Sequence, residues 1–456
     1  MQRIFNYLPV FFQNITITIF NIIAYRKRYG GKYKTYLNVF NSNKNLSLNE
    51  LKSIQQEKLI DFLKYAKSKS EYYNKRIISI ENNTKSNIIK NIPLLEKETL
   101  RKSINLIFTV SKKKSIISKT GGTTGKSLEV RFTYENMQER FAMLDSFRAE
   151  FGYELGKRTA WFSGKSILSK RDVNNDIYWK TDNYYNIRYY STFHINSYSI
   201  EFYINNLISF NPEFIVGFPS NLFEIANYGI KNNINFPDCY IKAIFPTAET
   251  ITENSRNVIE KFFNAKIYNQ YASSEGAPFI FECKKGSLHL ELQSGVFEVL
   301  DKNDKSTKKG RLILTSFTTY GTPLIRYDIG DDIELSDEVC TCGNNNPLVK
   351  QILGRDDDFI YSNETGKINL GNITNTLKGT IGIVKFQVVQ NSLEEITILI
   401  IIDDNEYTKN IEKIILKNWR ERVGESIKII LKIVKEIPVE KSGKFRIVKN
   451  NIKHLL

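Results

Sequence analysis

The sequence predicts an α/β fold, with a large N-terminal domain of layered α/β sheets. The chain has 456 residues, of which 41% are hydrophobic and 12% aromatic. This is enough for two or three domains with sizeable cores and is unlike a disordered chain. Residues 135–290 alternate helical stretches with short β runs such as 214–217 and 241–245. That alternation is typical of parallel strands covered by helices.

A second, smaller α+β domain is predicted at the C-terminal end. Residues 361–456 contain two β-rich runs, 384–389 and 396–402, followed by a helical pattern over 410–422. The polar cluster 354–358 separates this segment from a strand-rich, glycine-punctuated stretch before it. We therefore expect a domain boundary near residue 355, with residues 356–456 forming the smaller domain.

The first 110 residues are predicted to be mostly helical. Ser47 and Glu50 have the spacing of a capping box, in which each residue bonds the backbone N–H of the other, so we expect a helix from Leu48 towards Tyr72. The first 21 residues are apolar but interrupted by Asn, Gln, Thr and Pro, which favours neither a signal peptide nor a membrane span. An amphipathic helix lying on the domain, or on a membrane, fits this segment.

Net charge and cysteine content narrow the class of protein. The chain carries a net charge of +16, but its lysines are scattered and accompanied throughout by Asn and Ile. We interpret this as compositional bias and expect no nucleic-acid partner. Only four cysteines occur, as is usual for a cytoplasmic protein without structural disulfides.

The segment 118–127, Ser-Lys-Thr-Gly-Gly-Thr-Thr-Gly-Lys-Ser, is the clearest local signal for ligand binding. Its three glycines let several backbone N–H groups point to one place, while threonine hydroxyls and Lys126 suit a polyphosphate. The Walker pattern requires glycine where Thr120 stands, and a helix where 128–133 alternates as a strand. We therefore predict a phosphate loop between two strands; a plain glycine-rich hairpin turn is the alternative.

Two further segments carry carboxylates next to small residues. Glu275 in 271–276 follows a β run and could hold Mg²⁺, with Ser274 near a phosphate. Asp331 in 326–332 follows a glycine and could accept both hydroxyls of a ribose. Taken alone, each segment could equally be an ordinary turn.

Two polar segments, one at the domain boundary and one near the C-terminus, could bind a ligand only if the small domain folds over the phosphate loop. Arg355 could bind a ribose or phosphate oxygen, and Asp357 could be the pivot between domains. The turn Ser442–Gly443 presents Lys444. Without that context, a solvated linker and a solvated lysine are the simpler interpretations.

Three of the four cysteines and one of three histidines form a possible metal site, Cys283-x5-His289 and Cys340-x-Cys342. Zinc commonly takes three thiolates and an imidazole in a tetrahedral site. Cys-x-Cys is tighter than the usual spacing, so unrelated buried thiols remain the alternative.

The order of these segments resembles that of the adenylate-forming superfamily of acyl-CoA synthetases, and in detail its phenylacetate–CoA ligase/CapK branch, which includes proteins of capsule and O-antigen gene clusters. The resemblance covers roughly residues 110–446. It rests on Thr247-Ala-Glu-Thr250, Tyr271-Ala-Ser-Ser-Glu275, Cys283, His289, 323–331 (Pro-Leu-Ile-Arg-Tyr-Asp-Ile-Gly-Asp), Cys340-x-Cys342 and Gly354-Arg355. It implies a large adenylate-forming domain and a small mobile C-terminal lid: 1–110 its helical N-terminal part, 111–355 the ATP- and acid-binding core, and 356–456 the lid.

The resemblance also implies roles for single residues. The loop Thr120, Gly121, Gly122, Thr123, Thr124, Gly125 and Lys126 would hold the β- and γ-phosphates, although the usual loop has Ser or Thr where Gly121 stands. Ser274 would touch the α-phosphate, Glu275 would help hold Mg²⁺, and Lys444 would stabilise the pentavalent phosphate.

For the nucleoside, the implied residues come from four segments. Ala248 and Glu249 would border the adenine, Tyr271 would line the ATP site, and Asp331 and Arg355 would hold the ribose. Asp357 would be the hinge, and a structural zinc would be bound by Cys283, His289, Cys340 and Cys342.

Three functions follow as hypotheses. The first is activation of a carboxylic or amino acid with ATP and Mg²⁺, then transfer to an amine or carrier-protein thiol, as in decorating a surface polysaccharide. The second is an acid–CoA ligase of the phenylacetate type. The third is a zinc-stabilised basic binding protein for nucleic acid or a membrane that no longer catalyses. Peripheral membrane contact is compatible with each of the three. Lys444, Glu275 and Asp331 argue against the third.

Overall fold

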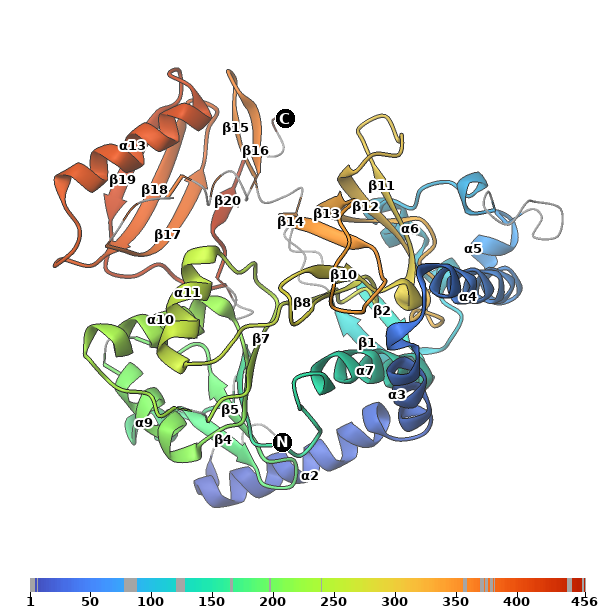
Figure 1. Ribbon diagram of the computed structural model, residues 1–456, viewed down its shortest axis with the longest axis horizontal. Helices are drawn as coiled ribbons and strands as arrows, with labels where there is room; N and C mark the ends of the chain where they lie inside the picture. The colour runs from blue at the N-terminus through green and yellow to red at the C-terminus, as the bar shows by residue number, and fades with distance from the viewer. Residues whose placement is uncertain are drawn as a thin grey trace.

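The computed structural model describes residues 5, 7–77, 88–119, 128–164, 167–196, 198–238, 240–355, 359–369, 373, 376–377, 380, 382–440, 445–452 and 455. The described strands form five sheets. The three larger sheets each have a core of their own, and a fourth core lies where N-terminal helices meet two of them (Figure 1). Among the described helices, none is both long and apolar enough to cross a membrane.

The N-terminal region is helical, as predicted. Its elements are α2 (Val10–Tyr29), α3 (Tyr33–Ser42), α4 (Leu48–Lys69), α5 (Glu71–Asn74) and α6 (Lys97–Ile107). The predicted capping box of Ser47 and Glu50 is confirmed at the start of α4. The helix ends at Lys69 and not at Tyr72, because Ser70 is extended and accepts a bond from Tyr73 N to begin α5.

A five-stranded sheet follows along the chain, as the alternating pattern predicts. Its order is β4-β5-β3-β6-β7, and β5, β3, β6 and β7 are parallel. The strands are β3 (Thr159–Ser163), β4 (Trp179–Asp182), β5 (Ile187–Ser191), β6 (Phe214–Gly217) and β7 (Ala243–Pro246). The helices of this region are α7 (Tyr134–Ala149), α8 (Lys170–Asn174), α9 (Ile200–Phe210), α10 (Pro219–Lys231) and α11 (Glu253–Phe263).

A seven-stranded antiparallel sheet carries most of the predicted nucleotide motifs. Its order is β11-β12-β13-β14-β10-β9-β8. The strands are β8 (Gln270–Ala272), β9 (Phe279–Glu282), β10 (Leu288–Leu290), β11 (Gly295–Leu300), β12 (Lys309–Ser316), β13 (Tyr327–Ser336) and β14 (Leu348–Arg355). Short 3-10 turns are Asn43–Asn45, Ile89–Asn91, Lys112–Lys114 and Leu292–Ser294.

The predicted phosphate loop is flanked by strands. β1 (Ile116–Lys119) pairs antiparallel with β2 (Glu129–Phe132), so the chain between them joins two strands of one hairpin. This agrees with the rejection of a Walker motif, which would run from a strand into a helix.

The C-terminal segment has its own sheet and core, shown in orange and red in Figure 1. β19 (Lys428–Ile433), β18 (Glu395–Ile402), β17 (Ile383–Gln390) and β20 (Val448–Asn450) form the sheet in that order, and α13 (Lys409–Val423) accompanies it. The hairpin β15 (Phe359–Ser362) and β16 (Gly366–Asn369) precedes it. Trp419 on α13 is fully buried in this core, and every described residue of the core belongs to 360–448. The predicted α/β fold with a separate small α+β part is therefore confirmed.

Candidate functional site

Three residues predicted at the nucleoside come together from separate strands. The Tyr271 hydroxyl at β8 donates a hydrogen bond to Oδ2 of Asp331 on β13. Asp331 pairs in register with Arg355 at the end of β14. Asp331 is only 8% exposed, so its carboxylate is largely removed from water. A buried carboxylate held by a phenol is suited to accept bonds from ligand hydroxyls.

Two adjacent serines in the turn after β8 differ in their hydrogen bonds and exposure. The Ser273 hydroxyl donates to Ala277 O at 2.5 Å and accepts from Glu275 N at 3.2 Å, so it stabilises the turn itself. Ser274 is exposed and Glu275 is buried at 5%. Of the two serines, Ser274 is the exposed one.

Arg140 on α7 is a residue of this site that the sequence did not indicate. Its Nη2 donates to Ser273 O at 2.8 Å, and its guanidinium lies 4.7 Å from the centroid of the Phe132 ring. Burial lowers the pKa of Arg140 to about 10, and the charge of Glu275 opposes this shift. A buried carboxylate such as that of Glu275 is a suitable kind of Mg²⁺ ligand. Here the Glu275 carboxylate also interacts electrostatically with the Arg140 guanidinium.

The segment 247–250 contacts the C-terminal part of the chain. Ala248 has φ of 64°, a left-handed conformation that is strained for alanine. The neighbouring Glu249 accepts one hydrogen bond from Ser220 N at 3.0 Å and another from Phe445 N at 2.7 Å, through different oxygens. Burial raises the pKa of the Glu249 carboxyl, and these two donors oppose that effect.

Helix α10 and the neighbouring Glu249 contact the C-terminal part. Near its first turn lies the Glu249 contact with Phe445. Further along, Glu224 forms an ion pair of 3.6 Å with Lys385 of β17, and at its end Lys231 pairs with Asp403. Among the described residues these three contacts are polar, as contacts between domains that move relative to one another often are.

Several predicted residues lie outside the described part of the chain. These are Thr120, Gly121, Gly122, Thr123, Thr124, Gly125, Lys126, Asp357 and Lys444. Their neighbours are described: the strands β1 and β2 bound the loop, and Phe445, which follows Lys444, bonds to Glu249.

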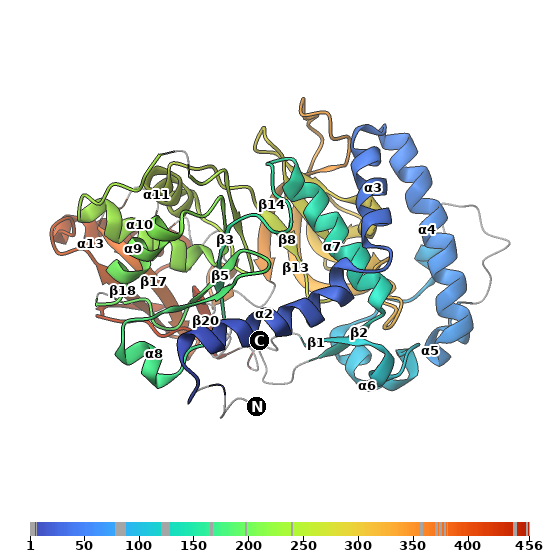
Figure 2. The same cartoon turned by 90° about the horizontal axis from the view of Figure 1, so that it is seen from below.

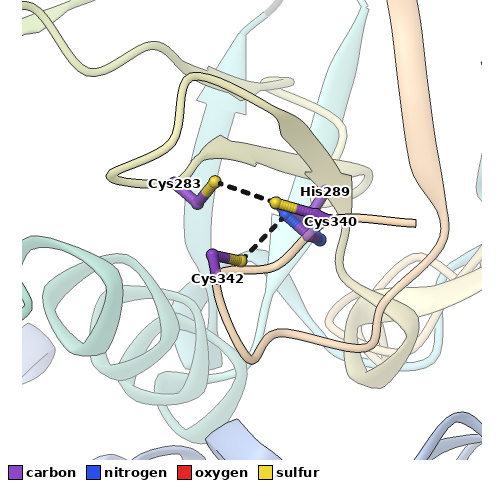
Figure 3. A group of neighbouring side chains, drawn as sticks. All are labelled: Cys283, His289, Cys340 and Cys342. Carbon is purple, nitrogen blue, oxygen red and sulfur yellow. Dashed lines mark hydrogen bonds between the residues drawn. The ribbon is translucent and has the colours of Figure 1, made fainter. Parts of the chain in front are cut away.

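The four possible metal ligands meet in one place, although 57 positions separate Cys283 from Cys340 (Figure 3). The ligand atoms of Cys283, His289, Cys340 and Cys342 all lie within 4.8 Å of one another. Cys283 Sγ is 3.7 Å from Cys340 Sγ, and Cys342 Sγ is 3.4 Å from His289 Nε2. A tetrahedral zinc with Zn–S bonds of about 2.3 Å separates its sulfurs by roughly 3.8 Å. The arrangement therefore fits a zinc ion.

Contacts around this cluster orient its histidine. Nδ1 of His289 lies 3.2 Å from Asn346 O, so a proton on Nδ1 leaves the lone pair of Nε2 facing the thiols. Burial lowers the pKa of His289, which favours the neutral, metal-binding form. Asn344 N donates to Cys342 Sγ at 3.4 Å, a bond that stabilises a thiolate.

The chain is similar to known proteins over almost its whole length. The family model "CapK C-terminal domain" matches residues 360–451. Protein CapK of Staphylococcus aureus is 33% identical over 459 residues, which cover 99% of this chain and 100% of that protein. A phenylacetate-coenzyme A ligase of Thermus thermophilus is 31% identical over 160 residues, or 33% of this chain and 36% of the ligase.

Solved structures show the same fold. A 2-hydroxyisobutyryl-CoA ligase in the postadenylation state superposes with a TM-score of 0.71 at 16% identity, covering 91% of this chain and 92% of that one. The same ligase in the thioesterification state gives 0.57 over the same shares. With the fold, the ordered motifs and the full-length match to CapK in agreement, the chain belongs to the CapK family of adenylate-forming proteins.

Proposed function

We propose that this protein uses ATP to convert a carboxylic acid to an acyl-adenylate and then transfers the acyl group to an acceptor. The convergence of Tyr271, Asp331 and the Arg355 backbone position, from three strands of the seven-stranded sheet, carries the proposal. It provides a buried carboxylate where a ribose would be bound. The exposed Ser274 and the β1–β2 loop would then lie towards the phosphates.

The chemistry requires charge neutralisation more than proton transfer. The attacking carboxylate is already ionised, so no protein base is needed; two anions must instead be brought together. The loop 120–126 and Lys444 would stabilise the charge that develops on the phosphorus. Mg²⁺, bound through Glu275, would add positive charge at the phosphates.

The position of the C-terminal part supports an arrangement suited to adenylation. Phe445 bonds to Glu249, a residue proposed to border the adenine, and Lys444 immediately precedes it in the sequence. The higher TM-score with the postadenylation state than with the thioesterification state, over equal shares of both chains, is consistent with this arrangement. We propose that residues 356–456 later rotate about Asp357 so that the acceptor can approach.

We propose an amine or a carrier-protein thiol as acceptor, in the synthesis of a surface polysaccharide in the cytoplasm. The resemblance of the motifs to a branch that includes proteins of capsule and O-antigen gene clusters supports this version, together with the full-length similarity to Protein CapK. The partial similarity to a phenylacetate-coenzyme A ligase supports CoA as the second candidate.

We further propose that the Cys283, His289, Cys340 and Cys342 cluster binds a structural zinc ion. It would join the β9–β10 hairpin to the segment between β13 and β14. Since three thiolates and an imidazole fill all four tetrahedral positions, no open position remains for a substrate.

Pyrophosphate release from ATP and Mg²⁺, measured across a panel of carboxylic and amino acids, tests the function. We expect release that depends on one class of acid and falls at least a hundredfold in Lys444→Ala. The matched control is Lys428→Ala, which replaces an exposed lysine on the edge strand β19 of the same domain. Zinc-replete protein that neither releases pyrophosphate nor binds ATP would reject the proposal in favour of a non-catalytic binding protein.

A further inference from the structure

Helix α2 has a reversed distribution of polar and apolar side chains. Its polar residues Asn14, Thr18 and Asn21 face the protein, and Asn21 is 8% exposed. Gln13, 1% exposed, donates to the carbonyl oxygens of Phe5 and Leu8 just before the helix. Asn21 Nδ2 donates to Asp182 Oδ2 at 2.7 Å, and the Asn14 side chain accepts from Thr181 N at 3.0 Å. These bonds attach α2 to β4 through its polar face.

The opposite face of α2 is apolar apart from Thr16 and is turned to solvent. Its exposed side chains are Phe11 67%, Phe12 52%, Ile15 37%, Ile19 54%, Phe20 65% and Ile23 58%. At about 100° per residue they occupy roughly half of the helix circumference, over a length of about 18 Å. Figure 2 shows α2 across the underside of the molecule, and no described segment covers it in that view. A contiguous apolar face of this kind marks an interaction surface.

Positive charge continues this face. Arg26 and Lys27, both exposed, follow on the same side of the helix by the same periodicity. The first 49 residues contain no Asp or Glu but seven basic residues: Arg3, Arg26, Lys27, Arg28, Lys32, Lys34 and Lys44. Lys32 and Lys44 form ion pairs with Glu135 and Glu150, whereas Arg26 and Lys27 adjoin the apolar face. Tyr184, 65% exposed in the turn after β4, lies beside α2, since its neighbour Asn183 bonds to Thr18.

We propose that α2 binds the surface of an anionic lipid bilayer, lying in the plane of the membrane with its apolar face among the acyl chains. An apolar helix face with adjoining Arg and Lys is the usual composition of such helices, and a lipid surface requires no matching groove. Tyr184 would lie at the headgroup level, where amphipathic rings are favoured. The charge disfavours a second copy as occupant, because two such faces would bring like charges together.

The test is co-sedimentation of the full chain with vesicles. Vesicles of equal phosphatidylglycerol and phosphatidylcholine should bind the protein at least tenfold more tightly than phosphatidylcholine alone. The triple variant Phe11→Ser, Ile19→Ser, Phe20→Ser should lose this binding, because its side chains leave the bilayer. All three are solvent-exposed, so the melting temperature should stay within a few degrees of the wild type.

Two further variants make the experiment specific. The double variant Leu106→Ser, Ile433→Ser removes exposed apolar side chains elsewhere and should bind as the wild type does. Arg26→Glu, Lys27→Glu should abolish the preference for anionic lipid. Absence of vesicle binding by the wild-type protein would overturn the proposal. So would a dimer that the triple variant dissociates, since α2 would then bind a second copy. Pyrophosphate release without vesicles is a separate readout and tests only the proposed function.

Discussion

The substitution Glu249→Gln tests the connection between the two parts of the molecule. One oxygen of the Glu249 carboxylate accepts a hydrogen bond from Ser220 N, and the other accepts one from Phe445 N. Glutamine has nearly the same shape but only one accepting oxygen, and its NH₂ group would face the second N–H. One of the two hydrogen bonds must therefore be lost.

The expected magnitude follows from the contact that is lost. Ser220 lies in the first turn of α10, where the helix dipole favours an acceptor, so the amide oxygen should stay there and the bond to Phe445 should break. A hydrogen bond to a charged group contributes about 1.5–3 kcal/mol. A loss of about 2 kcal/mol would weaken docking of the C-terminal part about 30-fold.

Isotope exchange between ATP and pyrophosphate, with the acid identified from the panel, measures the adenylation step. We expect Glu249→Gln to lower the exchange rate about 30-fold, and small-angle scattering to show a larger radius of gyration. Glu213→Gln is the matched control, because it removes an ion pair with Lys242 at 2.8 Å within the same sheet region. It should change exchange less than twofold, as exposed pairs contribute little.

The reasoning fails if Glu249→Gln exchanges at the wild-type rate and scatters as the wild type does. The Phe445 contact would then not control where the C-terminal part docks. Loss of exchange with an unchanged radius would also refute the docking argument, because it would assign Glu249 a role at the nucleotide alone.

Three other perturbations have defined outcomes. Tyr271→Phe removes the donor from buried Asp331, so the KM for ATP in the exchange assay should rise about tenfold or more; an unchanged KM would exclude this pair from the nucleotide site. Cys340→Ser should reduce bound zinc, measured by mass spectrometry, from about one ion per chain to a small fraction and lower the melting temperature by several degrees, whereas Cys239→Ser should change neither. Burial raises the pKa of Asp145 to about 6, so its contribution to stability is complete below about pH 4 and is lost as pH rises through 6. Urea unfolding between pH 4 and 7 should show this loss, of about 2–3 kcal/mol, in the wild type but not in Asp145→Asn; parallel pH profiles for the two proteins would contradict it.

The fold could be predicted from the sequence to a large extent because its signals are local. The bonds of Ser47 and Glu50 involve residues three apart, and an alternating stretch such as 128–133 shows its strand directly. The two strands on either side of the 120–126 loop followed from the character of their residues, and the structure adds that β1 and β2 pair antiparallel.

The candidate site could be predicted only where a motif marks it. Ser274 and Glu275 were named from their segment, but Arg140 was not, since a single arginine on a helix has no sequence signal and Ser273 is 133 positions away. The contact of Glu249 with Phe445 spans 196 positions and depends on how the C-terminal part docks.

By itself, then, the sequence determined the element types, the order of the motifs and the identity of four candidate zinc ligands. Hydrogen-bond periodicity and residue chemistry act over a few positions, so the chain records them directly. Only the tertiary structure decided that those ligands lie within 4.8 Å of one another, and that α2 turns its Asn and Gln side chains inward and its Phe and Ile side chains to solvent. An amphipathic pattern shows that a helix has two faces, but which face the protein covers depends on the polar groups of β4 against which it packs.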